Sequence, residues 1–203
     1  MEVVRFSEEM IPQASRLHVE AFSHHMNGRL GRRYAEAFLR WFCQADAAVI
    51  LAAVDTGEVI AYVAGAPPSE GRRRLRALAP VAARTLLARP WLILDKRLPA
   101  MVFTRLKLLF GREEDSVAPV ALPAPTMSLV AIAVSGARRR EGVGIRLVKA
   151  FEEEARRLRM NSLRLSARRD NLPARRLYEA CGWEPYSRES GATDVVYYVK
   201  RRL

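Results

Sequence analysis

The fold of this chain is decided by residues 128–183, which read SLVAIAVSGARRREGVGIRLVKAFEEEARRLRMNSLRLSARRDNLPARRLYEACGW. The segment begins with a short apolar run, residues 129–135, whose β-branched side chains are typical of a buried strand. An arginine-rich turn with two glycines follows, and apolar residues then recur at helical spacing from Val143 to Leu158. The sequence therefore predicts a strand, a glycine-bearing turn and an amphipathic helix.

A second strand and a second helix are predicted further along the same segment. Residues 162–167 alternate leucines with polar residues, as a strand does. Asp170 or Asn171 can cap the helix that follows, Pro173 is tolerated in its first turn, and a glycine ends it. The whole segment is therefore a strand–turn–helix–strand–helix unit of α/β type.

The glycine turn is suited to holding phosphate groups. The first N–H groups of a helix lack internal partners and its macrodipole is positive there, so phosphate oxygens are favoured. Gly142 and Gly144 lack the Cβ atoms that would keep a ligand from the backbone. The turn is not a dinucleotide fingerprint, because Leu147 stands where the third glycine should be, and no Walker lysine follows. On its own, such a turn is equally consistent with a tight connection that binds nothing.

Two motifs at matching separation resemble the GNAT superfamily of acyl-CoA-dependent N-acyltransferases. Residues 139–144, RREGVG, match that family's Gln/Arg-x-x-Gly-x-Gly/Ala pyrophosphate loop. Asn171, Ala174 and Tyr178 share one helical face through i, i+3, i+7 spacing, and with the following Gly-Trp pair they are similar to its second motif. The likeness implies one domain over residues 1–203, with a mixed sheet of six or seven strands flanked by helices.

The resemblance also implies how acetyl-CoA, the acyl donor, is bound. Backbone groups of Ile132, Ala133 and Val134 would pair with the pantetheine arm where their strand diverges from its neighbour. Asn171 would bond the pantetheine, and Ala174 would leave room for it. The pyrophosphate would be held by the residues of the glycine turn, namely Arg139, Arg140, Gly142, Val143, Gly144 and Ile145. No metal is implied.

Tyr178 and Glu20 are the predicted catalytic residues. A thioester is already activated, so the attacking amine needs only to be neutral, in line and close. The resemblance puts Tyr178 near the sulfur, where its phenol can protonate the departing thiolate; without the motif, an aromatic packed in the core is the simpler interpretation. Glu20, His24 and His25 are candidates for taking the amine's proton, since their pKa values can be tuned toward neutrality. Ordered water is the alternative acceptor.

We therefore predict transfer of an acetyl group to a primary amine, either an amino sugar or another small amine. Acetylation of protein N-termini or lysines is one alternative. A module that binds acyl-CoA without catalysis is another, and an assay of free thiol release over an amine panel separates it from the enzyme.

Composition bears on the partners and the setting. The net charge is +12, from 34 Lys and Arg against 22 Asp and Glu in 203 residues. No aromatic-and-basic motif of a nucleic-acid-binding module accompanies this charge, so no nucleic acid is expected, and an anionic CoA or acceptor accounts for the attraction. Cys43 and Cys181 lack metal-ligand spacing and are expected to be buried free thiols. Because the N-terminal MEVVRFSEEM is unlike a signal peptide, we expect a cytoplasmic location.

The upstream half predicts the first strands and helices of the sheet. Residues 3–6 read as a strand, and Ser7 as the cap of a helix over 8–22. A second helix is expected over 33–42, and the connection between the helices lines the acceptor pocket in the family. Two apolar runs around Asp55-Thr56-Gly57, residues 47–54 and 58–64, predict a hairpin.

A long insertion, about residues 66–125, separates this hairpin from the next strand. Two helices are expected within it, over 72–87 and 91–110, with Pro80, Pro90 and Pro99 breaking or kinking them. The insertion is interpreted as a lid over the acceptor pocket, as an oligomer interface, or as a basic surface that contacts anionic membranes. No run in it is long and charge-free enough to span a bilayer. A monomer or a homodimer is expected, and residues 195–199 form the last strand.

Overall fold

The structure is a computed structural model that describes residues 1–23, 26–89, 122–186 and 194–201. Its strands are β1 (Glu2–Arg5), β2 (Val49–Asp55), β3 (Glu58–Ala66), β4 (Thr126–Val134), β5 (Ser162–Arg168), β6 (Glu184–Tyr186) and β7 (Val195–Lys200). Its α-helices are α1 (Ile11–Ala21), α2 (Met26–Arg29), α3 (Arg32–Gln44), α4 (Glu70–Ala88), α6 (Val143–Arg157) and α7 (Leu172–Ala180).

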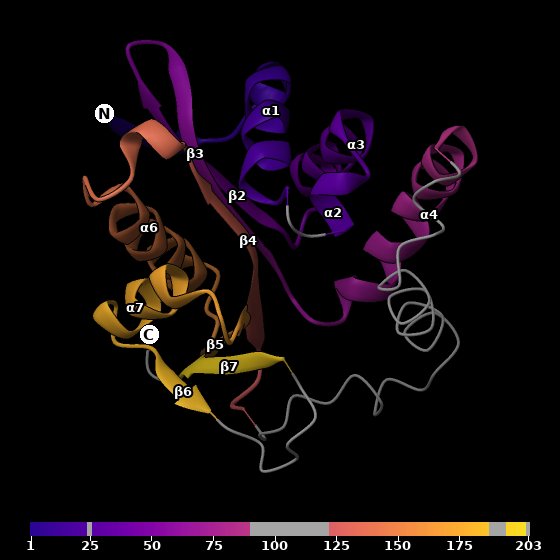
Figure 1. Cartoon of the computed structure of the whole chain (residues 1–203). Coiled ribbons are helices and arrows are strands. Elements are labelled where there is room, and N and C mark those ends of the chain that lie inside the picture. The colour runs from indigo at the N-terminus through magenta and orange to yellow at the C-terminus, as the bar shows by residue number, and fades with distance from the viewer. Residues whose placement is uncertain (24–25, 90–121, 187–193, 202–203) are drawn as a thin grey trace.

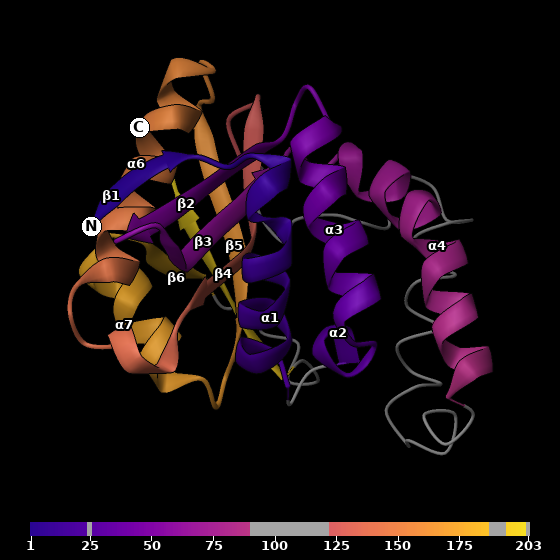
Figure 2. The same ribbon diagram turned by 90° about the horizontal axis from the view of Figure 1, so that it is seen from above.

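The seven strands form one mixed sheet in the order β1-β2-β3-β4-β5-β7-β6. Strands β4 and β5 run parallel, and the other neighbouring pairs run antiparallel. Helices α1 to α4 lie on one side of the sheet, while α6 and α7 lie on the other (Figure 1, Figure 2). The predicted α/β class and the seven-stranded mixed sheet are confirmed.

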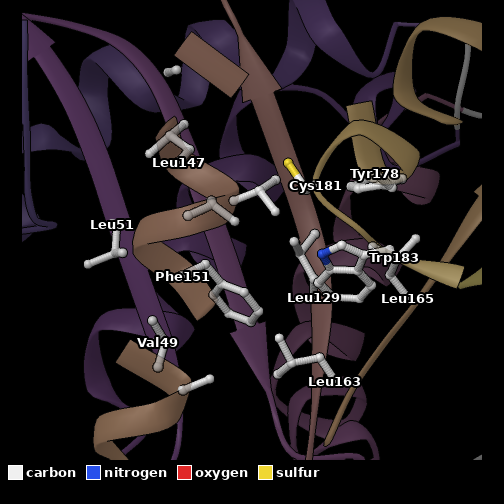
Figure 3. Packing of buried hydrophobic residues seen from close by; sticks show 14 of the residues in the cluster. Val49, Leu51, Leu129, Leu147, Phe151, Leu163, Leu165, Tyr178, Cys181 and Trp183 are labelled. Carbon is white, nitrogen blue, oxygen red and sulfur yellow. The ribbon is translucent and has the colours of Figure 1, made fainter. Parts of the chain in front are cut away.

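Each face of the sheet has its own apolar core. On the α6 side, Leu147 and Phe151 pack with Trp183 and with residues of β4 and β5 (Figure 3). Phe151 lies so close to β3 that a Cβ atom at Gly65 would come within 2.4 Å of its ring. On the other face, α1 and α3 cover the sheet with residues such as Phe38 and Leu39. The apolar residues that recur at helical spacing in the sequence are therefore buried against the sheet, those of α6 on one face and those of α1 and α3 on the other.

A polar network is buried at the edge of the α6 core. The Glu152 carboxylate, with 7 % of its side chain exposed, accepts a hydrogen bond from Trp183 Nε1 at 2.6 Å and one from Lys200 Nζ at 2.7 Å. Lys200 Nζ also donates to the Cys181 carbonyl at 2.8 Å. The network therefore ties α6, the end of α7 and β7 together.

Strand β4 contains a β-bulge at Val130. Ala64 of β3 pairs with Ala131 and Gly65 pairs with Leu129, so Val130 is an extra residue on β4. Leu129 packs in the α6 core, whereas Val130 and Ala131 both pack in the α1 core. The bulge therefore shifts the in-and-out alternation of β4 by one residue.

The predicted start of the first helix was wrong, and the break considered at Pro80 is not seen. The Ser7 side chain makes no capping hydrogen bond; a 3₁₀ turn (Glu8–Met10) follows it, and α1 begins at Ile11 with Pro12 in its first turn. Proline lacks a backbone N–H, so it fits where that N–H would have no helical partner. Pro80 does not break α4, which continues through it to Ala88.

The first part of the insertion is helical, as predicted. Helix α4 packs beside α3 by burying Leu78, and the Arg74 guanidinium lies 5.5 Å from the Trp41 ring centroid and 5.6 Å from that of Phe42. Such contacts bury an arginine against aromatic faces. The helix predicted over 91–110 lies outside the described residues.

Candidate functional site

The sheet opens between β4 and β5. These strands pair at only three positions near their starts, from Thr126 with Ser162 to Ser128 with Arg164. Beyond them β4 continues to Val134 beside β3, while β5 continues beside β7. The second half of β4 therefore has an edge that no described strand covers.

Backbone groups of β4 face this opening at alternate residues. The Ser135 N–H donates to the Ile60 carbonyl at 2.8 Å, so Ser135 is directed toward β3. Since alternate residues of a strand direct their amides to opposite neighbours, Ala133 also faces β3, whereas Ile132 and Val134 face the opening. Of the three predicted pantetheine-binding residues, the backbones of Ile132 and Val134 are thus the ones available for an extended ligand.

The glycine turn connects the end of β4 to α6. Arg140 and Gly142 have positive φ angles of 67° and 77°, and Gly142 caps the helix in the left-handed conformation. The first intrahelical bond is made by the Arg146 N–H to the Gly142 carbonyl at 3.1 Å. The preceding amides, including those of Val143, Gly144 and Ile145, therefore lack helical partners and suit a phosphate.

The three arginines of the turn have different environments. The Arg138 guanidinium is already paired within the protein, because it forms ion pairs with Asp55 of the β2–β3 hairpin and with Glu141 at 3.4 Å. Arg139 and Arg140 are exposed and have no acidic partner among the described residues. These two guanidinium groups are therefore free to meet the charge of a diphosphate.

The second predicted motif lies on α7, beside the turn. Asn171 caps α7, its Oδ1 accepting from the Ala174 N–H at 3.3 Å, so Asn171 rather than Asp170 is the cap. A Cβ atom at Gly144 would lie 3.2 Å from Leu177. Gly144 therefore allows α6 and α7 to approach closely, which the sequence alone did not indicate.

Tyr178 lies on the inward face of α7, with 5 % of its surface exposed. Its ring centroid is 6.1 Å from that of Trp183 and 5.8 Å from that of Tyr198, and Figure 3 shows it near Leu165 of β5. Burial, followed by the nearby Cys181 and Tyr198, raises the pKa of Tyr178, so its phenol stays protonated at neutral pH. Among the described residues its hydroxyl has no hydrogen-bond partner. Ile132, Val134 and Ala174 pack against the same apolar cluster.

Glu20 reaches the end of β4 from the opposite side of the sheet. It lies in the last turn of α1, is exposed, and its Oε1 would be 3.3 Å from a Cβ atom at Gly136. Gly136 follows Val134 by two residues, so the candidate base lies at the open end of β4. His24 and His25, the other candidates, lie outside the described residues.

A buried histidine–tyrosine pair lies beneath α1 and was not predicted as a feature of the site. His18 Nδ1 and the Tyr62 hydroxyl are 2.5 Å apart, and His18 packs against Phe22 and Phe38 with ring centroids at 4.7 and 5.1 Å. His18 Nε2 has no hydrogen-bond partner among the described residues. Tyr62 pairs with Ala133 across β3 and β4, so this pair supports α1 next to the opening. The sequence signal was limited to the position of His18 on the apolar face of α1.

We expect His18 to make the free energy of unfolding fall by about 2 kcal/mol between pH 7 and pH 5. Burial lowers the pKa of His18 to about 4, from 6.5. In this range the unfolded chain binds a proton at His18 and the folded chain does not, so stability is full above pH 6.5 and is lost as pH falls toward 4. Urea unfolding of wild type and His18→Gln at both pH values measures the difference. The other ionisable groups are common to both proteins, so an equal pH dependence would contradict the prediction.

The described residues hold no group of three or more His, Cys, Asp or Glu side chains arranged to bind a metal ion. Both cysteines are free thiols; Cys181 is buried as expected, whereas Cys43 is only half-buried. Burial, then Glu8, raises the pKa of the Cys43 thiol to about 11. In the described part of the chain, no helix has the length and hydrophobicity needed to cross a membrane.

Comparison with known proteins identifies the fold and gives a family match over part of the chain. Residues 107–183 match the model of the acetyltransferase (GNAT) family, and this range contains both motifs. No curated protein sequence matches the chain. Solved structures share the fold at low identity, beginning with a ribosomal-protein-alanine N-acetyltransferase from Brucella melitensis, which is 14% identical with a TM-score of 0.62 over 99% of each chain.

Two further structures extend this likeness. An aminoglycoside antibiotic 6'-N-acetyltransferase from Acinetobacter haemolyticus is 14% identical with a TM-score of 0.61, over 95% of this chain and 97% of that one. An aminoglycoside N-acetyltransferase in complex with CoA is 12% identical with a TM-score of 0.56, over 92% and 94%. The opened strand, the glycine turn and the match over residues 107–183 agree with one another: this part of the chain is similar to the acetyltransferase (GNAT) family, the chain shares the fold of these enzymes, and together they support an acyl-CoA-dependent acetyltransferase whose donor is acetyl-CoA.

Proposed function

We propose that the protein transfers the acetyl group of acetyl-CoA to a primary amine by direct attack, without an acyl-enzyme. The observation that supports this most is the uncovered edge of β4, which ends at the glycine turn that opens α6. The opening provides backbone groups for an extended arm, and the turn provides amides and arginines for a diphosphate. Adjacent residues can therefore bind both the extended pantetheine arm and the diphosphate of coenzyme A.

The chain's own residues divide the binding between them. The amides of Val143, Gly144 and Ile145, with Arg139 and Arg140, hold the diphosphate. Ile132 and Val134 bind the pantetheine arm along β4. Ala133 buries its side chain on the other face of the strand, and so supports this edge from behind. The Oδ1 atom of Asn171 is engaged in the helix cap, but its side-chain N–H groups remain available as donors. The small side chain of Ala174 leaves room for the pantetheine arm.

Three groups carry the chemistry. The thioester is the activated group, so the protein needs no nucleophile of its own. The Val134 N–H polarises the carbonyl that is attacked, a contribution typically worth about 3 kcal/mol. Glu20 removes the amine's proton, directly or through water, and the Tyr178 phenol gives a proton to the departing sulfur.

The acceptor is a small primary amine, an amino sugar among the candidates. Residues 1–203 act as one domain, with α4, the described helix of the 66–125 insertion, next to the acceptor. The donor and the two free cysteines favour the reducing cytoplasm.

An assay of free thiol release tests this proposal. With acetyl-CoA and a panel of primary amines, we expect thiol release that depends on the amine, and a higher Tm with either acetyl-CoA or CoA. The double variant Arg139→Ala/Arg140→Ala is expected to raise KM for acetyl-CoA about tenfold or more with little change in kcat. Arg156→Ala/Arg157→Ala, at the other end of α6, removes equal charge as the control. Binding without thiol release from any amine would instead indicate a non-catalytic acyl-CoA-binding module.

A further inference from the structure

The positive charge of the chain is unevenly distributed between the two faces of the sheet. Helices α6 and α7, on the donor side, carry six basic and four acidic residues. Helices α1 to α4, on the opposite side, carry three glutamates and ten arginines, namely Arg16, Arg29, Arg32, Arg33, Arg40, Arg72, Arg73, Arg74, Arg76 and Arg84. Binding of the CoA diphosphate at α6 does not account for this excess on the α1–α4 side.

Several of these arginines already have partners in the protein. Arg32 pairs with Glu36 at 2.9 Å, Arg40 with Glu8 at 3.8 Å, and Arg73 with Glu70 at 3.9 Å. Such surface pairs contribute little energy but reduce the local field. A further arginine, Arg89, follows α4, is exposed and has no acidic partner among the described residues.

Arg89 rests against the chain between α2 and α3. Its Nη1 would lie 3.0 Å from a Cβ atom at Gly31, and its Cζ and Nη2 would each lie 3.6 Å from it. Glycine at position 31 therefore leaves room for the Arg89 guanidinium, which lies close by. Gly31 has a φ of 81°, a second reason for glycine. No acidic group among the described residues contacts Arg89.

A continuous series of contacts links Arg89 to the reacting end of β4. Gly31 N–H donates to the Gly28 carbonyl at 2.9 Å, and a Cβ atom at Gly28 would lie 2.1 Å from the Phe22 carbonyl oxygen. Phe22 follows Glu20, which lies against Gly136. In Figure 2 the C-terminal ends of α1 and α4 and the short α2 lie along one edge of the helical layer.

We propose that Arg89 binds an oxyanion on the acceptor, so that the acceptor is a primary amine that also carries a phosphate or carboxylate group. The amine approaches Glu20 at the end of β4, and the anionic group approaches the Arg89 guanidinium. The field of the α1–α4 layer attracts such a molecule and repels a polycation. This inference rests on the proposed function, and it makes an aminoglycoside a poor acceptor.

Matched acceptors test the inference. Glucosamine 6-phosphate is compared with glucosamine, and 4-aminobutyrate with butylamine, while kanamycin supplies the polycation. We expect kcat/KM to be about tenfold or more higher for the anionic member of at least one pair, and to fall with added salt. A preference within the glucosamine pair indicates a phosphate on the natural acceptor, and a preference within the butylamine pair indicates a carboxylate. Equal use within both pairs, or preferred use of kanamycin, would overturn the inference.

Variants of Arg89 assign the effect to one side chain. Arg89→Ala is expected to raise KM for the preferred anionic acceptor about tenfold or more, with kcat and the KM for its neutral partner nearly unchanged. Arg89→Lys should recover part of the loss, since it keeps the charge without the planar fork. Arg84→Ala removes the same charge from an exposed position on α4, and an equal effect from it would overturn the role of Arg89. If no amine in the panel causes thiol release, the proposed function itself is refuted.

Discussion

Replacement of Tyr178 by Phe is expected to lower kcat by about a hundredfold or more, because the leaving thiolate loses its proton donor. The same change should cost the fold about 1 kcal/mol or less, since the Tyr178 hydroxyl has no hydrogen-bond partner among the described residues. Burial raises the pKa of this phenol, so wild-type activity should not decline at mildly alkaline pH through its ionisation. Steady-state kinetics at saturating acetyl-CoA and amine, together with urea unfolding, measure both quantities.

Tyr198→Phe is the matched control for this variant. The Tyr198 hydroxyl donates to Glu179 at 2.6 Å and accepts from Arg175 at 3.2 Å, so it has a structural role in the same aromatic cluster. Its loss should lower stability by about 1 kcal/mol and leave kcat nearly unchanged. Unchanged turnover in Tyr178→Phe would remove the acid role, and the ring would then be a core aromatic.

The base is examined in the same assay. Glu20→Gln keeps the size of the side chain but removes its capacity to take a proton, so kcat should fall. A kcat equal to that of wild type would mean that water accepts the amine's proton.

Lys200→Met is expected to lower the free energy of unfolding by about 3–5 kcal/mol, the largest effect on stability that we anticipate. The variant removes the cation that pairs with Glu152, whose carboxylate is buried against Trp183. A buried carboxylate without its cation keeps the desolvation cost and loses the compensating attraction. Urea unfolding of both proteins at neutral pH gives the difference directly.

A second pair supplies the control for Lys200. Arg5 and Glu154 are 2.8 Å apart, but the Arg5 side chain is 85 % exposed, so Arg5→Met should cost less than about 1 kcal/mol. The double variant Glu152→Leu/Lys200→Met removes both charges and should recover much of the stability lost in Lys200→Met. A Lys200→Met protein as stable as wild type would show that the pair is solvated in solution.

The local parts of the fold could be predicted from the sequence because their signals are local. The glycine turn, the periodic apolar residues of α6 and the alternation in β5 each lie within one element. The cap of α7 was narrowed to Asp170 or Asn171, and the choice depended on rotamers: Asp170 pairs with Arg168, which leaves Asn171 to accept from the helix.

Features that depend on distant partners could not be predicted. His18 and Tyr62 are 44 residues apart, and a histidine on an apolar helix face does not identify its partner. The contact between Gly144 and Leu177 arises only when α6 and α7 are packed. The approach of Arg89 to Gly31 likewise joins the end of α4 to a loop that precedes it by more than fifty residues.

The extra residue at Val130 divides β4 into two halves of opposite phase. Before it, odd-numbered side chains point toward α6; after it, odd-numbered side chains point toward α1. Deletion of Val130 would leave Leu129 opposite Gly65 and Ala131 opposite Ala64, so the ladder would become regular and the amides of Ile132 and Val134 would still face the opening. A one-residue deletion after Ala131, where the ladder is regular, would instead exchange the amides that face β3 with those that face the opening, so the enzyme should tolerate it far less than the loss of Val130.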